Sequence, residues 1–158
     1  MKKLLLVYSL FALLFSLLTS CAASSQLAKA TSPTATPGPA NLAALRQYLG
    51  RNPNEEKFLE AGPLNSRLKS LLGNRHKAFL TCLQTVGPLS EEKGVLYLVG
   101  NKPQSSGTEA AAIVLDPKTD AIFIWMMVKG KTEEFKEGKK EILLPRDVLA
   151  TMTNTKSK

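Results

Sequence analysis

The side chains that could perform catalysis are few and poorly placed for it. His76 is the only histidine, and it shortly precedes Cys82, the second of two cysteines. A histidine can activate a thiol, but a reactive thiolate needs a polar or cationic setting, and Cys82 lies in the apolar run 79–83. We therefore interpret Cys82 as a small buried residue and His76 as an exposed residue at a helix start. The sequence predicts no catalytic residue and no enzyme.

Other groupings that carry chemistry do not occur in the sequence. The paired carboxylates, Glu91 with Glu92 and Glu133 with Glu134, fall in expected loops or edges and are interpreted as solvating charge. No His, Cys and carboxylate cluster has metal-ligand spacing, and no glycine-rich phosphate loop is present. The formal net charge is +8, but the cations are scattered and do not alternate with aromatic residues. We expect no cofactor, no metal and no nucleic-acid partner; an acidic cleft or polymer suits this charge better.

The first cysteine, Cys21, has the clearest chemistry. Lys2 and Lys3 precede the apolar run 4–18, and two small polar residues then lead to Cys21. This order is typical of a secretory signal peptide, and about 15 apolar residues are too few to span a bilayer as a helix. The segment 18–21, Leu-Thr-Ser-Cys, resembles the lipobox of bacterial lipoproteins. The resemblance implies cleavage before Cys21, a diacylglycerol on its thiol, and an acyl chain such as palmitate on the new amino group.

Two alternatives remain open for the N-terminus: an uncleaved anchor, or an ordinary signal peptide cut near Ala22 or Ala23. Lipidation is the leading interpretation, because several acyl chains on one residue give stable membrane anchoring. The residue after Cys21 is alanine and not aspartate. By resemblance to sorted lipoproteins, this implies the outer membrane, facing the periplasm. We therefore expect a lipid-anchored protein of the bacterial cell envelope.

Composition divides the rest of the chain. Residues 1–20 are the expected signal peptide, and residues 21–40 are the lipidated cysteine and a tether rich in Ala, Ser, Thr and Pro. Such a segment has too few large apolar residues to offset the entropy of ordering it. Residues 41–150 are enough for a single α+β domain with one core, and residues 151–158 are expected to be a frayed basic tail. The sequence indicates no oligomeric state.

The first half of the domain has helical periodicity. Leucines recur at helical spacing over 42–49 and again over 64–72, where Gly73 is a natural end. Asn54, before two glutamates, is an expected N-cap. A further short helix is expected around 79–83. These helices must cover one face of whatever structure follows.

The second half has the pattern of an antiparallel sheet. Its apolar, β-rich runs are 94–100, 110–115 and 121–128. A hairpin should turn at Pro117 and Lys118, and a second turn at 129–131 should precede a short strand at 133–136. Trp125 and the two methionines after it belong to the core. With a last helix opening at Pro145, the sequence predicts an α+β fold in which N-terminal helices pack on an antiparallel sheet in two layers.

The polar connection 101–107 differs from the other turns. It reads Asn101-Lys102-Pro103-Gln104-Ser105-Ser106-Gly107, with Pro and Gly fixing its shape. Here the sequence resembles the Ivy family of inhibitors of vertebrate (c-type) lysozyme, in which a strand leads into a protruding Cys-Lys-Pro-His-Asp-Cys-Gly loop. Lys102, Pro103 and Gly107 match in place, and the resemblance covers roughly residues 58–137. It implies an Ivy-like fold and a partner-binding loop formed by all seven residues.

Four positions of the loop depart from the family pattern. Asn101 and Ser106 stand where the family has cysteines, Gln104 where it has the histidine that enters the enzyme, and Ser105 where it has aspartate. A disulfide pre-orders a loop and lowers the entropic cost of binding, so a loop without one should be softer. Glutamine offers only neutral hydrogen bonds, whereas histidine can carry charge. Lys102 remains as the cation of the loop.

Two hypotheses of different classes follow. The leading one is a membrane-tethered periplasmic binding module whose loop 101–107 enters the acidic groove of a lysozyme-like or other peptidoglycan-cleaving enzyme, with Lys102 near the catalytic carboxylates. The alternative is a structural or accessory lipoprotein of an envelope complex without inhibitory activity. An inhibitor needs an exposed, convex loop, whereas an assembly subunit needs an apolar surface patch of several hundred Å².

Overall fold

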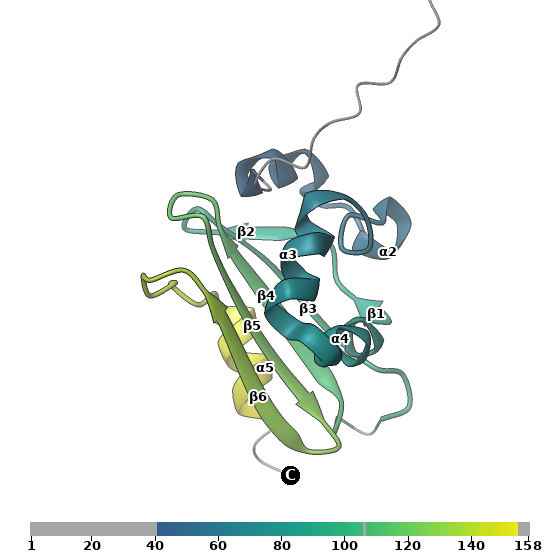
Figure 1. Ribbon diagram of the computed structural model, residues 1–158. Helices are drawn as coiled ribbons and strands as arrows, with labels where there is room; N and C mark the ends of the chain where they lie inside the picture. The colour runs from purple at the N-terminus through teal and green to yellow at the C-terminus, as the bar shows by residue number, and fades with distance from the viewer. Residues whose placement is uncertain (1–40, 106, 155–158) are drawn as a thin grey trace, which may run out of the picture. The chain divides into compact units, whose positions relative to one another are not determined.

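The computed structural model describes residues 41–154 apart from Ser106, and Figure 1 draws the rest as a thin trace. The expected signal peptide, the lipidated Cys21 and the tether therefore lie outside the described residues, as do residues 155–158 of the expected tail. Within the described part, no helix combines the length and the apolar character that crossing a membrane requires.

Helices precede the sheet, and one more helix follows it. The helices are η1 (Leu42–Tyr48, 3₁₀), α2 (Pro53–Glu56), α3 (Gly62–Leu72), η2 (Gly73–Arg75, 3₁₀), α4 (His76–Cys82) and α5 (Arg146–Asn154). The strands are β1 (Thr85–Val86), β2 (Ser90–Glu92), β3 (Val95–Asn101), β4 (Ala110–Asp116), β5 (Ala121–Val128) and β6 (Lys131–Glu137). The predicted α+β class is confirmed.

The start of α2 corrects the expected cap. Asn52, and not Asn54, is the N-cap, and Pro53 occupies the first turn, where its missing N–H costs nothing. The side-chain amide of Asn54 instead donates to the carbonyl oxygen of Gln84, 3.1 Å away. The amide of Asn52 likewise donates to the carbonyl oxygen of Val86. Asn52 therefore covers a carbonyl oxygen on the edge of the short strand β1, and Asn54 covers the residue just before this strand.

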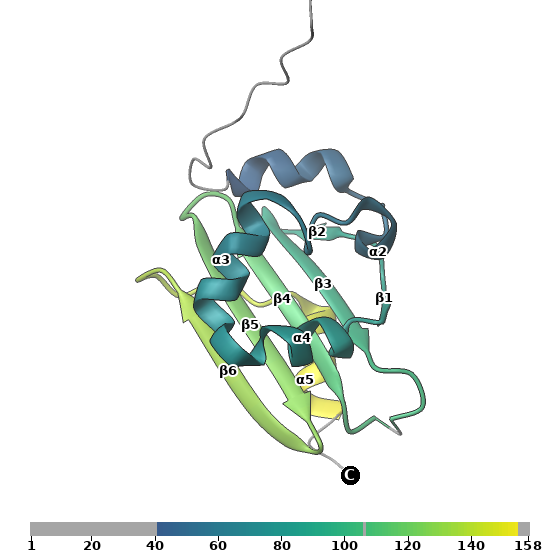
Figure 2. The ribbon, with the colours of Figure 1, turned by 45° about the vertical axis from the view of Figure 1, so that its right-hand side comes forward.

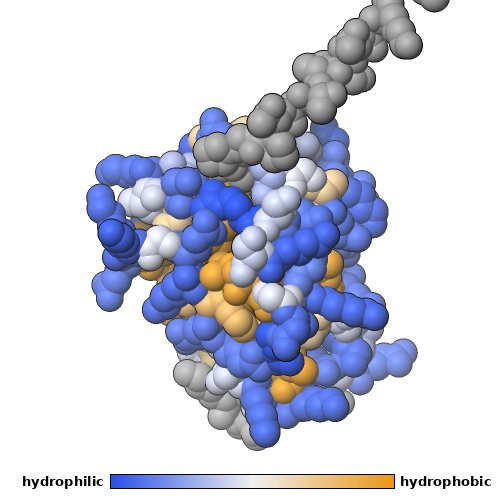
Figure 3. Space-filling model, viewed as in Figure 1, coloured by the Kyte–Doolittle hydropathy of each residue, from blue (hydrophilic) through white to orange (hydrophobic). Residues whose placement is uncertain are grey.

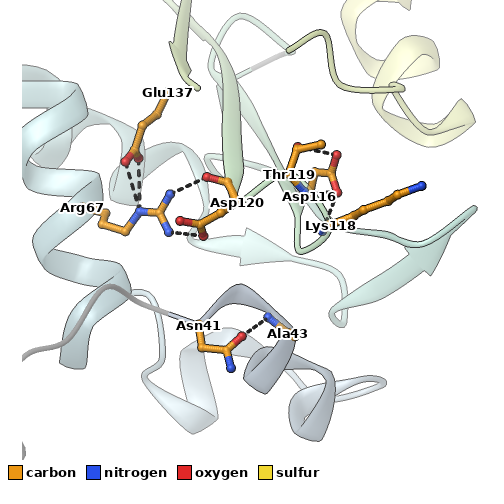
Figure 4. A network of polar contacts seen from close by, with 8 residues as sticks. All are labelled: Asn41, Ala43, Arg67, Asp116, Lys118, Thr119, Asp120 and Glu137. Atoms are coloured by element: carbon orange, nitrogen blue, oxygen red, sulfur yellow. Dashed lines mark hydrogen bonds and ion pairs between the residues drawn. The ribbon is translucent and has the colours of Figure 1, made fainter. Parts of the chain in front are cut away.

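The other helix boundaries follow the sequence pattern. Asn41 caps η1, since its side-chain oxygen accepts a hydrogen bond from the N–H of Ala43 at 3.0 Å (Figure 4). The predicted helix over 64–72 is α3, and it ends at Gly73, whose φ of 51° suits glycine. Leu64, like the other buried leucines of α3, faces the sheet.

The strands form one antiparallel sheet in the order β1-β3-β4-β5-β6, with β2 also paired to β3 (Figures 1 and 2). The expected hairpin is confirmed, because Asp116 pairs with Ala121 and the chain turns between them. The expected strand at 133–136 is part of β6, which is longer and begins at Lys131. It begins early because Lys129 and Gly130, with φ of 52° and 76°, make a two-residue hairpin turn.

Arg67 joins α3 to the sheet at the end where the β4–β5 hairpin turns. Its guanidinium donates to the Asp120 carboxylate at 2.7 Å and to the Glu137 carboxylate at 3.2 Å (Figure 4). The turn itself is held by Asp116, whose carboxylate accepts from the N–H of Lys118 at 2.8 Å. This end of the sheet is therefore held by ion pairs and hydrogen bonds between α3, the β4–β5 turn and the end of β6.

Both faces of the central strands β4 and β5 are buried. Alternate residues of β4 and β5, including Ile113 and Ile124, pack under α3 and α4, while Ala112 and Trp125 face the other way, toward Val148 of α5. Figures 1 and 2 show α5 on the side of the sheet opposite to α3. The fold therefore has the two expected layers and a partial third layer formed by α5. The third layer is needed because β4 and β5 are apolar on both faces.

The C-terminal boundary also needs correction. Residues 151–154 were expected in a frayed tail but form the last turn of α5. They are helical because Val148 is buried against the sheet and Met152 packs beside it. The folded domain therefore continues past the expected boundary at residue 150.

Candidate functional site

The β3–β4 connection protrudes beyond the sheet (Figures 1 and 2), and hydrogen bonds hold it on both sides. On the β3 side, the N–H of Lys102 donates to the carbonyl oxygen of Glu109 at 3.0 Å, which continues the β3–β4 ladder. On the β5 side, the N–H of Gly130 donates to the carbonyl oxygen of Thr108 at 3.0 Å. The base of the loop is therefore an extension of the central sheet.

Three side chains close the loop at its base, and we call Lys102, Ser105 and Glu109 the loop brace. The ammonium of Lys102 forms an ion pair with the carboxylate of Glu109, whose side chain is only 13% exposed. The hydroxyl of Ser105 donates to the carbonyl oxygen of Lys102 at 2.7 Å and lies 3.3 Å from that of Glu109. The brace therefore links the two sides of the loop without a covalent bond.

The tip of the loop is exposed and uncharged. Pro103 and Gln104 are both exposed, and Gln104 has a left-handed φ of 59°. Gly107 returns the chain with a φ of 76°, which glycine adopts without strain. Ser106 lies outside the described residues. The tip therefore offers a carboxamide and a pyrrolidine ring to a partner.

The loop brace changes what Lys102 can contribute. Sequence reasoning treated Lys102 as the cation that would approach catalytic carboxylates, whereas the structure pairs it with Glu109 inside the loop. Its positive charge is compensated locally and its side chain is 40% exposed. The loop expected to be soft for want of a disulfide thus has a non-covalent restraint of its own.

Asn101 stands apart from the brace. It is the last residue of β3, is exposed, and with Gly107 lines an open surface depression of about 550 Å³. The other side of this depression is formed by β1 and by Thr151 and Asn154 near the end of α5. All of its lining residues are uncharged.

Cys82 is buried, as expected, and is not an activated nucleophile. Its thiol is 3.6 Å from the carbonyl oxygen of Met127, and burial, reinforced by the Glu109 carboxylate, raises the pKa of the thiol to about 11. His76 starts α4, but it is partly buried and not exposed; burial and the charge of Lys69 lower its pKa. Among residues 41–154 other than Ser106, no three potential ligands gather into a metal site.

Sequence reasoning missed Glu109 as a member of the site. Glu109 precedes the expected strand 110–115 and carried no signal of its own, yet it lies opposite Lys102 once Asn101 pairs with Ala110. Opposite charges facing each other across two strands stabilise the pair, so strand register would have revealed this contact. The hydrogen bond between Gly130 and Thr108 had no signal in the sequence, because it joins two separate turns.

We expect Glu109→Gln to loosen the loop without unfolding the domain. The substitution keeps the size of the side chain but removes the ion pair with Lys102. Stability should fall by about 1 kcal/mol or less, because Lys102 is partly solvated. Amide hydrogen exchange on the full chain should become faster in peptides covering 101–109, while β4 and β5 keep their protection.

The charge-swapped pair Lys102→Glu with Glu109→Lys provides the rescue, because it reverses the ion pair and keeps it. Glu60→Gln is the matched control, since it removes an exposed ion pair with Lys57 away from the loop. Unchanged exchange over 101–109 in Glu109→Gln, or loss of protection in the swapped variant equal to that in the single one, would show that the ion pair does not order the loop.

Comparison with known proteins identifies the family. The family model described as inhibitor of vertebrate lysozyme (Ivy) matches residues 63–158, which include the loop, the central strands and α5. The match extends beyond the region of resemblance seen in the sequence, through the C-terminal helix. No match was found among curated proteins or among solved structures. Because the match covers more than half of the chain and contains the braced loop, this protein belongs to the Ivy family, the inhibitors of vertebrate lysozyme.

Proposed function

We propose that this protein is a non-catalytic, inhibitor-like binding module that inserts the loop 101–107 into the substrate cleft of a peptidoglycan-cleaving enzyme of the lysozyme type. The observation that carries the proposal is the shape of this loop: it protrudes, its base is closed by the loop brace, and its tip is exposed. Membership of an inhibitor family supports the same partner class.

The chemistry of the tip fits a glycan-binding cleft. Most glycosidases carry two carboxyl groups beside the scissile bond, together with donors and acceptors for sugar hydroxyl and acetamido groups. The carboxamide of Gln104 can donate to such a carboxylate and accept from such a donor. Because the loop brace restricts the loop before binding, less entropy is lost on insertion. The neutral tip should nevertheless bind a dianionic site more weakly than a charged one.

The surface gives less support to assembly through an apolar patch. Among the described residues, the large apolar side chains that are clearly exposed are Leu49, Leu143 and Leu149. The face drawn in Figure 3 is mainly hydrophilic, with an apolar area at its centre and smaller apolar areas apart from it. Scattered leucines are normal on a soluble surface, whereas an assembly interface needs a contiguous area.

A competition experiment tests the insertion of the loop. The full chain, kept in a mild detergent, is added to immobilised c-type lysozyme with and without a chitin oligosaccharide that occupies the cleft. We expect weak binding that the oligosaccharide displaces and that Gln104→Ala reduces, while Lys118→Ala at the opposite end of β4 leaves it unchanged. If neither the oligosaccharide nor Gln104→Ala changes binding, the contact lies outside the loop. If the full chain does not bind at all, c-type lysozyme is not the partner.

We propose further that the protein works on the periplasmic side of the outer membrane, held by lipids on Cys21. This part is supported by the leader sequence and by the segment 18–21 before the folded domain. The tether 22–40 would let the loop reach enzymes in the periplasm.

Cys21→Ser is expected to abolish lipidation and to leave the domain folded. The thiol is the only group at the expected cleavage site that can form a thioether with diacylglycerol, and the described domain begins twenty residues later. Metabolic labelling with an alkyne fatty acid, followed by click chemistry, measures the lipid. Cys82→Ser is the matched control and should keep its label. Label that survives the loss of Cys21 would contradict the lipoprotein assignment.

A further inference from the structure

We propose that the β5–β6 turn forms the second half of the partner-binding surface, with Lys129 and Lys131 meeting an acidic rim of the partner's cleft. This inference rests on the proposed function of the loop 101–107 and goes beyond it by naming where the attractive charge lies. We call Lys129, Gly130 and Lys131 the lysine turn.

The lysine turn is attached directly to the loop. The N–H of Gly130 donates to the carbonyl oxygen of Thr108 at 3.0 Å, just beyond the last strand pair, Ala110 with Met127. Figures 1 and 2 place the β5–β6 turn and the protruding β3–β4 connection at the same end of the sheet. A partner that receives the tip of the loop therefore passes close to this turn.

The exposed positive charge at this end lies outside the loop, chiefly on the lysine turn. The Glu109 carboxylate compensates the charge of Lys102. Lys129 and Lys131 are both exposed and form no ion pair with any of the described residues. Lys77 adds an exposed cation nearby, since it lines a depression of about 360 Å³ together with Glu109 and Val128.

The backbone of the turn has a defined conformation, so Lys129 and Lys131 start from fixed positions relative to the loop. Val128 pairs with Lys131 across the hairpin, and Lys129 and Gly130 fill the two turn positions with left-handed φ angles. A two-residue turn of this kind matches the twist of its strands and leaves little freedom to the backbone. Its hydrogen bond to Thr108 fixes it relative to the loop as well.

The expected role of the lysine turn is to attract and orient the partner. Two carboxyl groups flank the scissile bond in most glycosidases, and two exposed cations that meet such an acidic cleft are expected to raise the rate of association. Salt screens exposed charges, because the Debye length becomes shorter as ionic strength rises. The contribution of the two lysines to binding should therefore be smaller at high salt. The neutral tip of the loop should supply the salt-independent part of the affinity.

The test compares variants of the full chain, in mild detergent, on immobilised c-type lysozyme at low and at high salt. Replacing both Lys129 and Lys131 by Gln should weaken binding about threefold to tenfold at low salt and much less at high salt. The matched control replaces Lys118 and Lys139 by Gln. It removes the same charge at the opposite end of the sheet, where both residues are exposed.

The outcomes separate this inference from the proposed function. If the Lys129 and Lys131 variant behaves like the control while Gln104→Ala still weakens binding, the lysine turn is not part of the surface and the function of the loop stands. If the variant loses affinity equally at both salt concentrations, the electrostatic role is wrong. If the wild-type chain does not bind lysozyme at either salt concentration, the proposed function fails and this inference fails with it.

Discussion

Restoring the family loop is expected to strengthen inhibition of c-type lysozyme by about one to three orders of magnitude. The variant combines Gln104→His with Asn101→Cys and Ser106→Cys, and the wild type should inhibit weakly or not at all. Histidine can form a charge-assisted hydrogen bond with an active-site carboxylate, worth roughly 1.5–3 kcal/mol, and each 1.4 kcal/mol is about tenfold in affinity. The disulfide would add order to the loop, although engineered disulfides often give less than expected.

The structure favours this substitution at the tip. Gln104 has a left-handed φ of 59° and is exposed, and histidine is among the residues that tolerate this region better than most. The new side chain would project from a loop already closed by the brace of Lys102 and Glu109. The gain from histidine should therefore not depend on the disulfide, and the disulfide should add less than in an unbraced loop.

A turbidity assay with c-type lysozyme measures the effect in the wild type, Gln104→His and the triple variant. Gln104→Asn is the matched control, because it keeps a neutral amide at a position with positive φ, and it should gain nothing. Strong inhibition by the wild type would show that the loop suffices without the histidine and the disulfide of the family pattern. An oxidised, folded triple variant without any gain would remove the loop from consideration as an inhibitory element and favour the accessory-lipoprotein hypothesis.

Trp125→Ala is expected to lower the free energy of unfolding by about 3–5 kcal/mol, a large fraction of the total for a domain of this size. Trp125 is completely buried in the middle of β5, and it belongs to the part of the core that lies under α5. Its removal leaves a cavity next to Val148, so α5 should lose its protection first.

Trp125→Phe is the informative partner of that substitution. The indole N–H is buried without a hydrogen-bond partner in the described part of the chain, and such a group costs roughly 1–3 kcal/mol. Phenylalanine removes the unpaired donor and keeps most of the ring, so the loss should stay below about 1.5 kcal/mol. Urea unfolding of the full chain, followed by circular dichroism, measures both variants. Equal losses would show that the indole N–H has a partner or that the ring shape itself is required.

Much of the fold could be predicted because the relevant patterns are local. The apolar run 121–128 matches β5 residue for residue, and the polar turn 116–120 produced the expected hairpin. Gly73 ended a leucine-periodic helix as expected. The prediction was wrong where two nearby residues could fill the same role. Both Asn52 and Asn54 could cap α2, and Asn52 does so because Pro53 is favoured in the first turn. The packing of α5 on the second face of the sheet was missed, because the sequence of an apolar strand does not indicate which element will bury each of its faces.

The candidate site was only partly visible in the sequence. The position and composition of 101–107 could be assigned, because Pro and Gly mark a connection between two strands and because the segment resembles a known loop. The sequence could not show that Lys102 is neutralised, since its partner Glu109 faces it only when the strands are in register. Register depends on the whole ladder, including contacts far from the loop.

By itself, the sequence determined that helices precede the sheet, and it determined the residues at the tip of the loop; the lipidation of Cys21 stays a prediction. Tertiary structure decided which charges remain free: Lys102 is paired within the loop, whereas Lys129 and Lys131 are left exposed beside it. The physical reason is that an ion pair or a hydrogen bond between separate turns needs atoms within a few Å of each other. Only the packed sheet brings Gly130 to Thr108 and so makes one surface from two turns.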